Sequence, residues 1–133
     1  MNIAIKIKRH DISYIQQLFN LMFQINIEFI DYVSFYNISN ILKKIQKVNF
    51  NSNFNTKKIF TINLTPNEAQ EFIQLVNKSN NLINKNPYHI GLIIEIVSTI
   101  QKQLSTLESQ KNNLANNLIL TIPKTLNRRN QYL

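Results

Sequence analysis

Two short segments alternate apolar and polar residues along the chain. In "IAIKIK" (3–8) the isoleucines fall on one side, while Lys6 and Lys8 fall on the other. In "KIFTINLT" (58–65) the apolar residues again take every second position. Because successive side chains of a strand point to opposite faces, each segment predicts a half-buried β-strand.

Three other segments carry apolar residues three and four positions apart, which is the spacing of an amphipathic helix. The first follows Asp11, a residue type that is favoured at helix N-caps. The second lies in the latter half of 28–48. The third starts at Thr65, which together with Pro66 and Glu68 predicts an N-cap, a proline in the first turn and a capping box.

A last periodic segment predicts a long helix that begins at Pro87 and runs to about Asn116. Its apolar positions recur in alternate steps of four and three residues, the heptad spacing of helices that pack against helices. The series consists of Ile93, Val97, Ile100, Leu104, Leu107, Lys111, Leu114 and Leu118, and Lys111 is its polar member. Such a helix is about 45 Å long, whereas a domain of this size is only about 30 to 35 Å across.

The two halves of this helix therefore have different predicted roles. Residues 90–104 are expected to close the core. For the rest of the helix there are two alternatives, which are fraying in solvent and contact with another chain. The second half is expected to contact another chain, either a second copy or a neighbour in an assembly. The residues of this self-association surface are Leu104, Leu107, Leu114 and Leu118.

The order of these segments predicts an α+β fold that is rich in helix, with a small sheet and a long C-terminal helix. Residues 1–118 are expected to form a single compact domain. Within it, 1–50 and 57–118 have the pattern of two βαα units, and chance similarity within a biased set of residues is the alternative. Residues 119–133 are expected to form a short strand, from alternating apolar residues that start at Leu118, and a basic tail.

The chain of 133 residues carries 15 Lys and Arg against 7 Asp and Glu, for a formal net charge of +8. A basic surface attracts nucleic acid or anionic membranes. The chain is also rich in Asn, Ile and Lys, whose codons are A/T-rich, so a biased genome accounts for part of this charge. A solvated basic face is therefore the alternative to nucleic-acid contact. The residues proposed for that contact are Lys6, Lys8, Arg9, Lys43, Lys44, Lys47, Lys57, Lys58, Arg128 and Arg129.

Residues that could carry catalysis or hold a metal are sparse. The chain has no Cys and two His, and its single Gly leaves no glycine-rich loop for phosphate. His10 beside Asp11 is typical of a solvated junction, with a general base and its orienting carboxylate as the alternative. Glu68 and Glu71 share a helix face, but the cap explains the first and solvent exposure the second. We therefore expect no enzyme, and no catalytic, cofactor-binding or metal site.

The most apolar stretch, 18–42, is interrupted by Glu28 and Asp31. A membrane span needs about 20 mostly apolar residues with few charges, so no membrane partner is expected. The first residues also lack the long apolar region of a signal peptide. The expected location is cytoplasmic or virion-associated.

The segment "INLTPNEAQEFIQLV", followed by "NPYHIGLIIEIVSTIQKQL", resembles a pattern in small phage-encoded proteins of unassigned role. The matching positions within 62–103 are Leu64, Thr65, Glu68, Ala69, Pro87, Ile100, Gln101 and Gln103. The chain departs from that pattern in its longer, Asn-rich loop between the two helices. The resemblance implies a phage or mobile-element origin, and it offers no active site to transfer.

Together these patterns favour a non-catalytic structural or accessory subunit of a larger assembly, such as a phage virion. The expected partners are proteins, as a homo-oligomer or as assembly neighbours, and the long helix is the expected self-association surface. One alternative is a basic protein that binds nucleic acid. A second alternative is a small inhibitor that binds a host protein.

Overall fold

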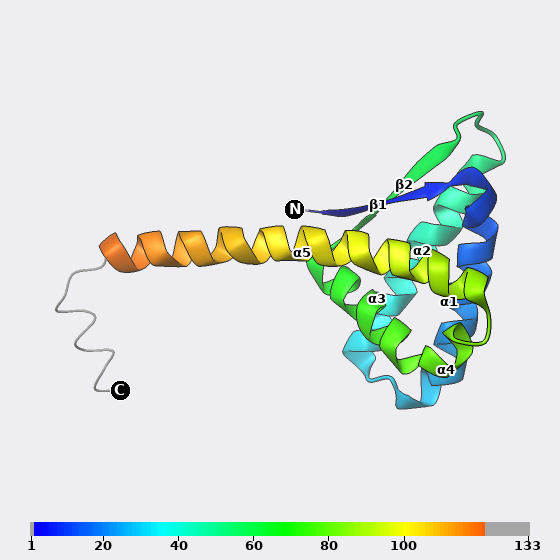
Figure 1. Cartoon of the computed structure of the whole chain (residues 1–133), viewed down its shortest axis with the longest axis horizontal. Helices are drawn as coiled ribbons and strands as arrows, with labels where there is room; N and C mark the ends of the chain where they lie inside the picture. Colours follow the sequence, from blue (N-terminus) through cyan, green and yellow to red (C-terminus); the bar gives the residue numbers. More distant parts are fainter. Residues whose placement is uncertain (1, 122–133) are drawn as a thin grey trace. The chain divides into compact units, whose positions relative to one another are not determined.

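A computed structural model describes residues 2–121 of the chain, with side chains as far as Leu118 (Figure 1). It is rich in helix and contains one two-stranded antiparallel sheet and a long C-terminal helix, which confirms the α+β class at this level. The elements are β1 (Ile3–Lys8), the 3-10 turn η1 (Arg9–Asp11), α1 (Ile12–Asn26), the 3-10 turn η2 (Ile27–Phe29), α2 (Tyr32–Ser52), β2 (Ile59–Leu64), α3 (Pro66–Lys78), α4 (Asn80–Ile83) and α5 (Pro87–Thr121).

The two predicted strands pair with each other along their full length. Ile3 lies opposite Leu64, and Ile5 lies opposite Ile62, so one face of the ribbon is apolar. These four side chains are buried, whereas Lys6, Lys8, Thr61 and Asn63 on the opposite face are exposed and Ala4 is half-buried. The alternation in the sequence therefore predicted both the strands and the face that each turns to the core.

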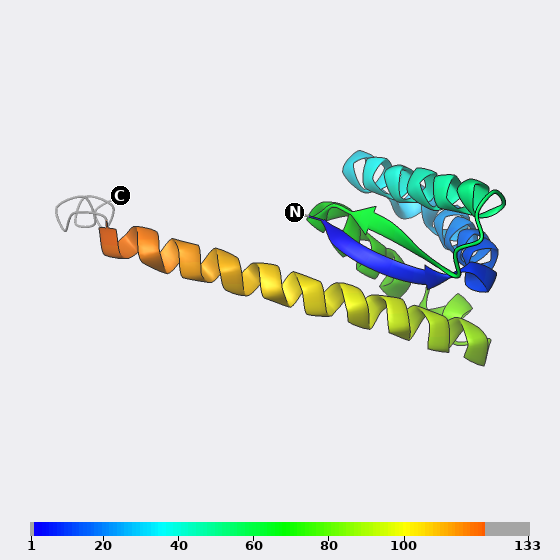
Figure 2. The same cartoon turned by 90° about the horizontal axis from the view of Figure 1, so that it is seen from above.

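The core lies between the apolar face of the ribbon and the helices. Figures 1 and 2 both show α1 beside α2, and α2 runs along β2. The rings of Phe19 and Phe72 stack with centroids 5.6 Å apart, which joins α1 to α3. Ile41 of α2 and Ile100 of α5 are also fully buried. Burial of each such side chain contributes roughly 1.5–3 kcal/mol.

Helix α3 begins as its sequence predicts. The Thr65 hydroxyl accepts from the Glu68 amide at 3.2 Å, and the Glu68 carboxylate accepts from the Thr65 amide at 3.0 Å. Pro66 occupies the first turn, where it does not need to donate a backbone hydrogen bond. The Lys44 ammonium lies 2.6 Å from the same carboxylate, so Glu68 also joins α3 to α2.

Two polar residues have roles that differ from the expected ones. Glu71 was expected to be exposed, but it is buried and accepts from the Ser34 hydroxyl at 2.7 Å. Asp11 precedes α1 but makes no side-chain cap. The turn η1 places it in a helical conformation, and its carboxylate accepts from the Tyr88 hydroxyl instead.

The end of the compact domain differs from the expected one. The chain divides into two units, 1–101 and 102–133, so the first unit ends before residue 118. Helix α5 extends to Thr121, somewhat beyond the predicted end. The short strand expected from Leu118 is therefore wrong as far as Thr121. The basic tail, with Arg128 and Arg129, lies outside the described residues.

β1 is followed by two α-helices, α1 and α2, whereas β2 is followed by three, α3, the short α4 and α5. The equivalence of the two halves stays a prediction.

Candidate functional site

The pairing of the strands brings two predicted basic clusters to one end of the sheet. Lys8 ends β1 opposite Ile59 of β2. The next amide, that of Arg9, donates to the Lys58 carbonyl at 2.8 Å. The two segments 6–9 and 57–58 therefore lie together, as they should if the strands pair. Their contact with nucleic acid stays a prediction.

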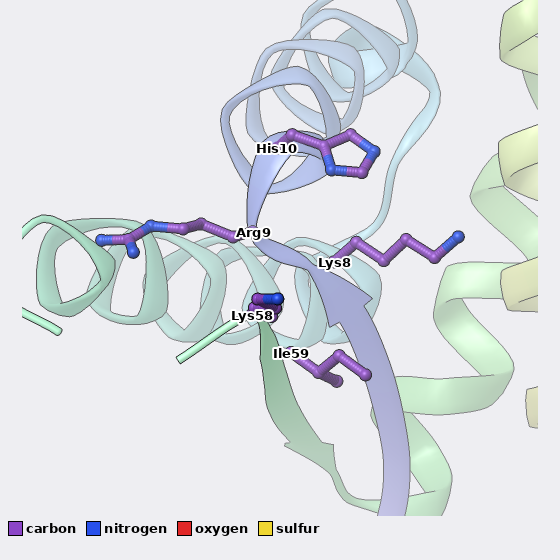
Figure 3. Close-up of a pocket in the computed structure, with 5 residues that line it drawn as sticks. All are labelled: Lys8, Arg9, His10, Lys58 and Ile59. Atoms are coloured by element: carbon purple, nitrogen blue, oxygen red, sulfur yellow. The ribbon is translucent and has the colours of Figure 1, made fainter. Parts of the chain in front are cut away.

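A hollow of about 520 Å³ opens at this end of the sheet (Figure 3). Its lining contains no acidic residue and consists of Lys8, Arg9, His10, Lys58 and Ile59. Lys8 and His10 extend to one side of the strand end in Figure 3, and Arg9 extends to the other. Positive charge without a lining carboxylate favours an anion in such a hollow.

Arg9 has a second role that links the sheet to a helix. Its guanidinium donates to the carbonyl oxygen of Ser52, the last residue of α2. A cation at a helix C-terminus is favourable because the last carbonyls and the helix dipole present partial negative charge there. Arg9 therefore holds the end of α2 beside the hollow. Lys44 is likewise engaged, since Glu68 neutralises its charge.

The outer face of α2 carries features that the sequence analysis did not identify. Tyr32 is 94% exposed, Tyr36 is 66% exposed and Phe50 is 65% exposed. Lys43 and Lys47, which were predicted, are exposed on the same helix. Along the chain these residues come in the order Tyr32, Tyr36, Lys43, Lys47 and Phe50, which are four, seven, four and three positions apart. Because a helix has 3.6 residues per turn, these spacings place all five residues on one face. We call these five residues the α2 outer face.

The aromatic residues were missed because aromatic side chains near apolar neighbours were assumed to be core. The distribution of charged residues in the sequence does single out this helix. No acidic residue occurs between Asp31 and Glu68, although five lysines lie in that stretch. An acid-free helix with rings in line with its lysines is one arrangement that suits a nucleic acid.

Near the start of α5 lies a cluster of aromatic and polar side chains. The rings of Tyr14 and Tyr88 meet edge to face with centroids 4.7 Å apart, and Tyr14 also lies 5.4 Å from the ring of His89. The hydrogen bond that the Tyr88 hydroxyl donates to Asp11 raises the pKa of Tyr88, since it stabilises the neutral phenol. The cluster joins the start of α5 to the start of α1.

This cluster does not present an organised acid–base pair. Nε2 of His10 lies 3.6 Å from the Asp11 carboxylate, but that carboxylate is already engaged by Tyr88. The His10 side chain is largely exposed. The Tyr14 hydroxyl and Nδ1 of His89 are buried without a hydrogen-bond partner. No catalytic geometry follows from these contacts.

The described acidic and histidine side chains do not gather into a metal site, and the described helices do not suit a membrane span. Residues 2–121 contain no group of three or more His, Asp or Glu placed to hold a metal ion. Over the same residues, no helix combines the length and the apolar character that crossing a membrane requires.

The described part of the second unit is the distal segment of α5, Lys102 to Thr121. None of its residues up to Leu118 is buried. Leu104 and Leu107 are half-buried, while Leu114 is 61% exposed and Leu118 is 55% exposed. The leucine series therefore continues past the end of the first unit. Its role in self-association stays a prediction.

Comparison of the chain with protein-family models, with curated proteins and with solved structures finds no match.

Proposed function

We propose that this protein is a non-catalytic structural or accessory subunit that associates with further copies of itself through the distal segment of α5. One observation carries the proposal. The first compact unit ends at Gln101, yet the helix continues to Thr121 with leucines at heptad spacing. The setting in a phage virion rests only on the resemblance of residues 62–103, and the identity of the neighbouring genes tests it.

The distal segment of α5 has no buried residue up to Leu118 that would stabilise it as a single helix. In proteins most of a helix's stability comes from the packing of an apolar face and not from its own backbone hydrogen bonds. Leucines at the a and d positions of a heptad stabilise a helix when they pack against a second one. Leu107 and Leu114 occupy d positions, and Leu104 occupies an a position. A second copy of the chain carries the same leucine series, so each helix can bury the leucines of the other.

Lys111 supports a specific arrangement of the two copies. It is exposed and occupies an a position between the leucines. A single polar residue at such a position restricts the register and orientation of helix pairs. A parallel, in-register pair sets two Lys111 ammonium groups against each other, which is unfavourable. An antiparallel pair sets a positions against d positions and so separates these charges.

The proposal is tested by light scattering coupled to gel filtration over a range of protein concentrations. The unmodified chain should gain mass as concentration rises. Leu107→Asp with Leu114→Asp should abolish this gain, since it places carboxylates in the seam. Ser105→Asp with Asn112→Asp adds the same charge at exposed positions outside the seam and should leave association nearly unchanged. Equal effects of the two pairs would contradict the proposal.

A further inference from the structure

We propose that the α2 outer face binds single-stranded nucleic acid. The bases would stack on Tyr32, Tyr36 and Phe50, and Lys43 and Lys47 would contact the phosphates. This inference does not depend on self-association through α5, because it rests on a different element and on different residues.

The exposure of the rings is the first observation. Tyr32, Tyr36 and Phe50 are each about two-thirds or more exposed, so most of the surface of each side chain is in water. Single exposed apolar residues are ordinary, but three rings in line on one helix form a surface that suits a ligand. Base–aromatic stacking uses such rings regardless of base identity, because every base has a flat apolar face.

The charge on this face is the second observation. Lys43 and Lys47 lie between the rings, and both are exposed. Lys44, on a different side of the helix, is the lysine of α2 that is engaged in an ion pair, with Glu68. A nucleic acid satisfies both features together, because it offers bases to the rings and phosphates to the ammonium groups.

The same features disfavour a protein partner on this face. Burial of an unpaired ammonium group against an apolar surface is costly, and lysine is depleted in the buried centres of protein interfaces. They also favour single strands over duplexes. Bases in a duplex are already stacked on each other, so their faces are not free to contact Tyr36 or its neighbours.

The surface has a defined length and a basic end. Tyr32 and Phe50 are separated by five helical turns, or about 27 Å. Beyond Phe50, the ring of Phe54 lies 5.2 Å away and is also exposed. The hydrogen bond from Arg9 to Ser52 places the hollow lined by Lys8 and Lys58 next to this end of α2. We expect the bound nucleic-acid strand to continue from Phe50 toward this hollow.

The experiment uses the full chain and a fluorescein-labelled oligothymidylate, with fluorescence anisotropy as the measurement. To exclude effects of avidity, it is performed in the Leu107→Asp, Leu114→Asp background. Binding should be strong at low salt and should weaken steeply as salt is raised. A duplex of the same length should bind more weakly. Because the protein contains no Trp, its tyrosine fluorescence is directly observable and should be quenched by the oligonucleotide.

Variants separate stacking from general attraction by charge. Tyr36→Leu and Phe50→Leu should each weaken binding by roughly tenfold. Phe29→Leu changes another exposed ring, outside the α2 outer face, and should have little effect. Lys43→Gln with Lys47→Gln should weaken binding and reduce the salt dependence, whereas Lys85→Gln with Lys102→Gln removes the same charge elsewhere and should do much less. Circular dichroism checks that each variant is folded.

Two results would overturn the proposal. The first is no binding at low salt. The second is binding that does not depend on the α2 outer face. It would be seen as ring variants without effect and lysine pairs with equal effects, or as heparin and anionic vesicles that bind as tightly as the oligonucleotide. That second result identifies attraction of any polyanion to a basic protein.

Discussion

The Ser34 hydroxyl of α2 donates a hydrogen bond to the Glu71 carboxylate of α3, with 2.7 Å between the two oxygens. Both residues are buried. The bond therefore supplies a partner to a carboxylate that has lost most of its contact with water. It also fixes how α2 and α3 face each other, 37 residues apart in the chain.

Loss of this donor should destabilise the fold. Ser34→Ala leaves the buried carboxylate without its partner, and we expect a loss of about 1–3 kcal/mol in the free energy of unfolding. Urea denaturation measures it. Ser98→Ala removes an exposed serine from α5 and should change stability by no more than about 0.5 kcal/mol. Equal effects of the two changes would show that the hydrogen bond contributes nothing.

The first part of α5 should contribute to the core through specific residues. Ile100→Ala creates a cavity at a fully buried position, and we expect it to cost about 2–5 kcal/mol. Ile94→Ala makes the same chemical change on the same helix, at a position that is 58% exposed. Its expected cost is about 0.5 kcal/mol or less. Urea denaturation distinguishes the two, and similar costs would contradict the packing described for α5.

Stability in acid should depend on Asp31. Its carboxylate accepts from the Ser34 amide at 2.8 Å and caps α2. This hydrogen bond is the main cause that lowers the pKa of Asp31 below its ordinary 3.8. A group with a lowered folded-state pKa stabilises the protein above the unfolded value, and this contribution is lost as pH falls through the folded value. The loss should therefore develop below about pH 4.

Asp31→Asn tests this dependence. Asparagine also caps helices well, but it does not titrate. Its urea midpoint should fall less steeply with acid below about pH 4 than the midpoint of the unmodified chain. If the urea midpoints of the two proteins fell equally steeply below about pH 4, Asp31 would not contribute to the acid dependence.

Parts of the fold were predictable because their causes are local. The alternation of Ile3 and Ile5, and the capping box of Thr65 and Glu68, depend on residues close in the chain. The series Ile93 to Ile100 likewise predicted a helix that closes the core. In the structure Ile96 is also buried, because neighbours on several elements determine which face of α5 is covered.

Other parts depend on contacts between distant residues. A glutamate is usually a surface residue, and nothing near Glu71 in the sequence indicates that Ser34 will meet it. The same holds for Asp11, whose partner Tyr88 lies 77 residues away. Near Leu118 a short apolar run fits either a strand or a helix, and periodicity alone does not separate the two. Here the helix continued.

The candidate surfaces show the same division. The leucine series and the basic clusters could be read from spacing and charge. The exposed rings of Tyr32 and Tyr36 could not, because an aromatic residue next to apolar neighbours has the same local pattern whether it is buried or exposed. Only the packing of α2 against α1, α3 and the ribbon determines which side of the helix remains in water.

The seam of α5 should become stronger when its charge is removed. Lys111→Leu replaces the one polar residue of the leucine series, and we expect the dissociation constant of self-association to fall by roughly tenfold or more. Asn112→Leu adds the same side chain at an exposed position outside the seam and should change it little. Analytical ultracentrifugation measures both. An unchanged constant for Lys111→Leu would place the contact elsewhere on the molecule.

Sedimentation equilibrium of the unmodified chain tests the central claim most directly. The monomer has a mass of 15.7 kDa. The account predicts an average mass that rises above this value with concentration and returns to it when Leu107 and Leu114 are replaced by aspartate. A mass that stays at the monomer value at every concentration would contradict self-association through α5.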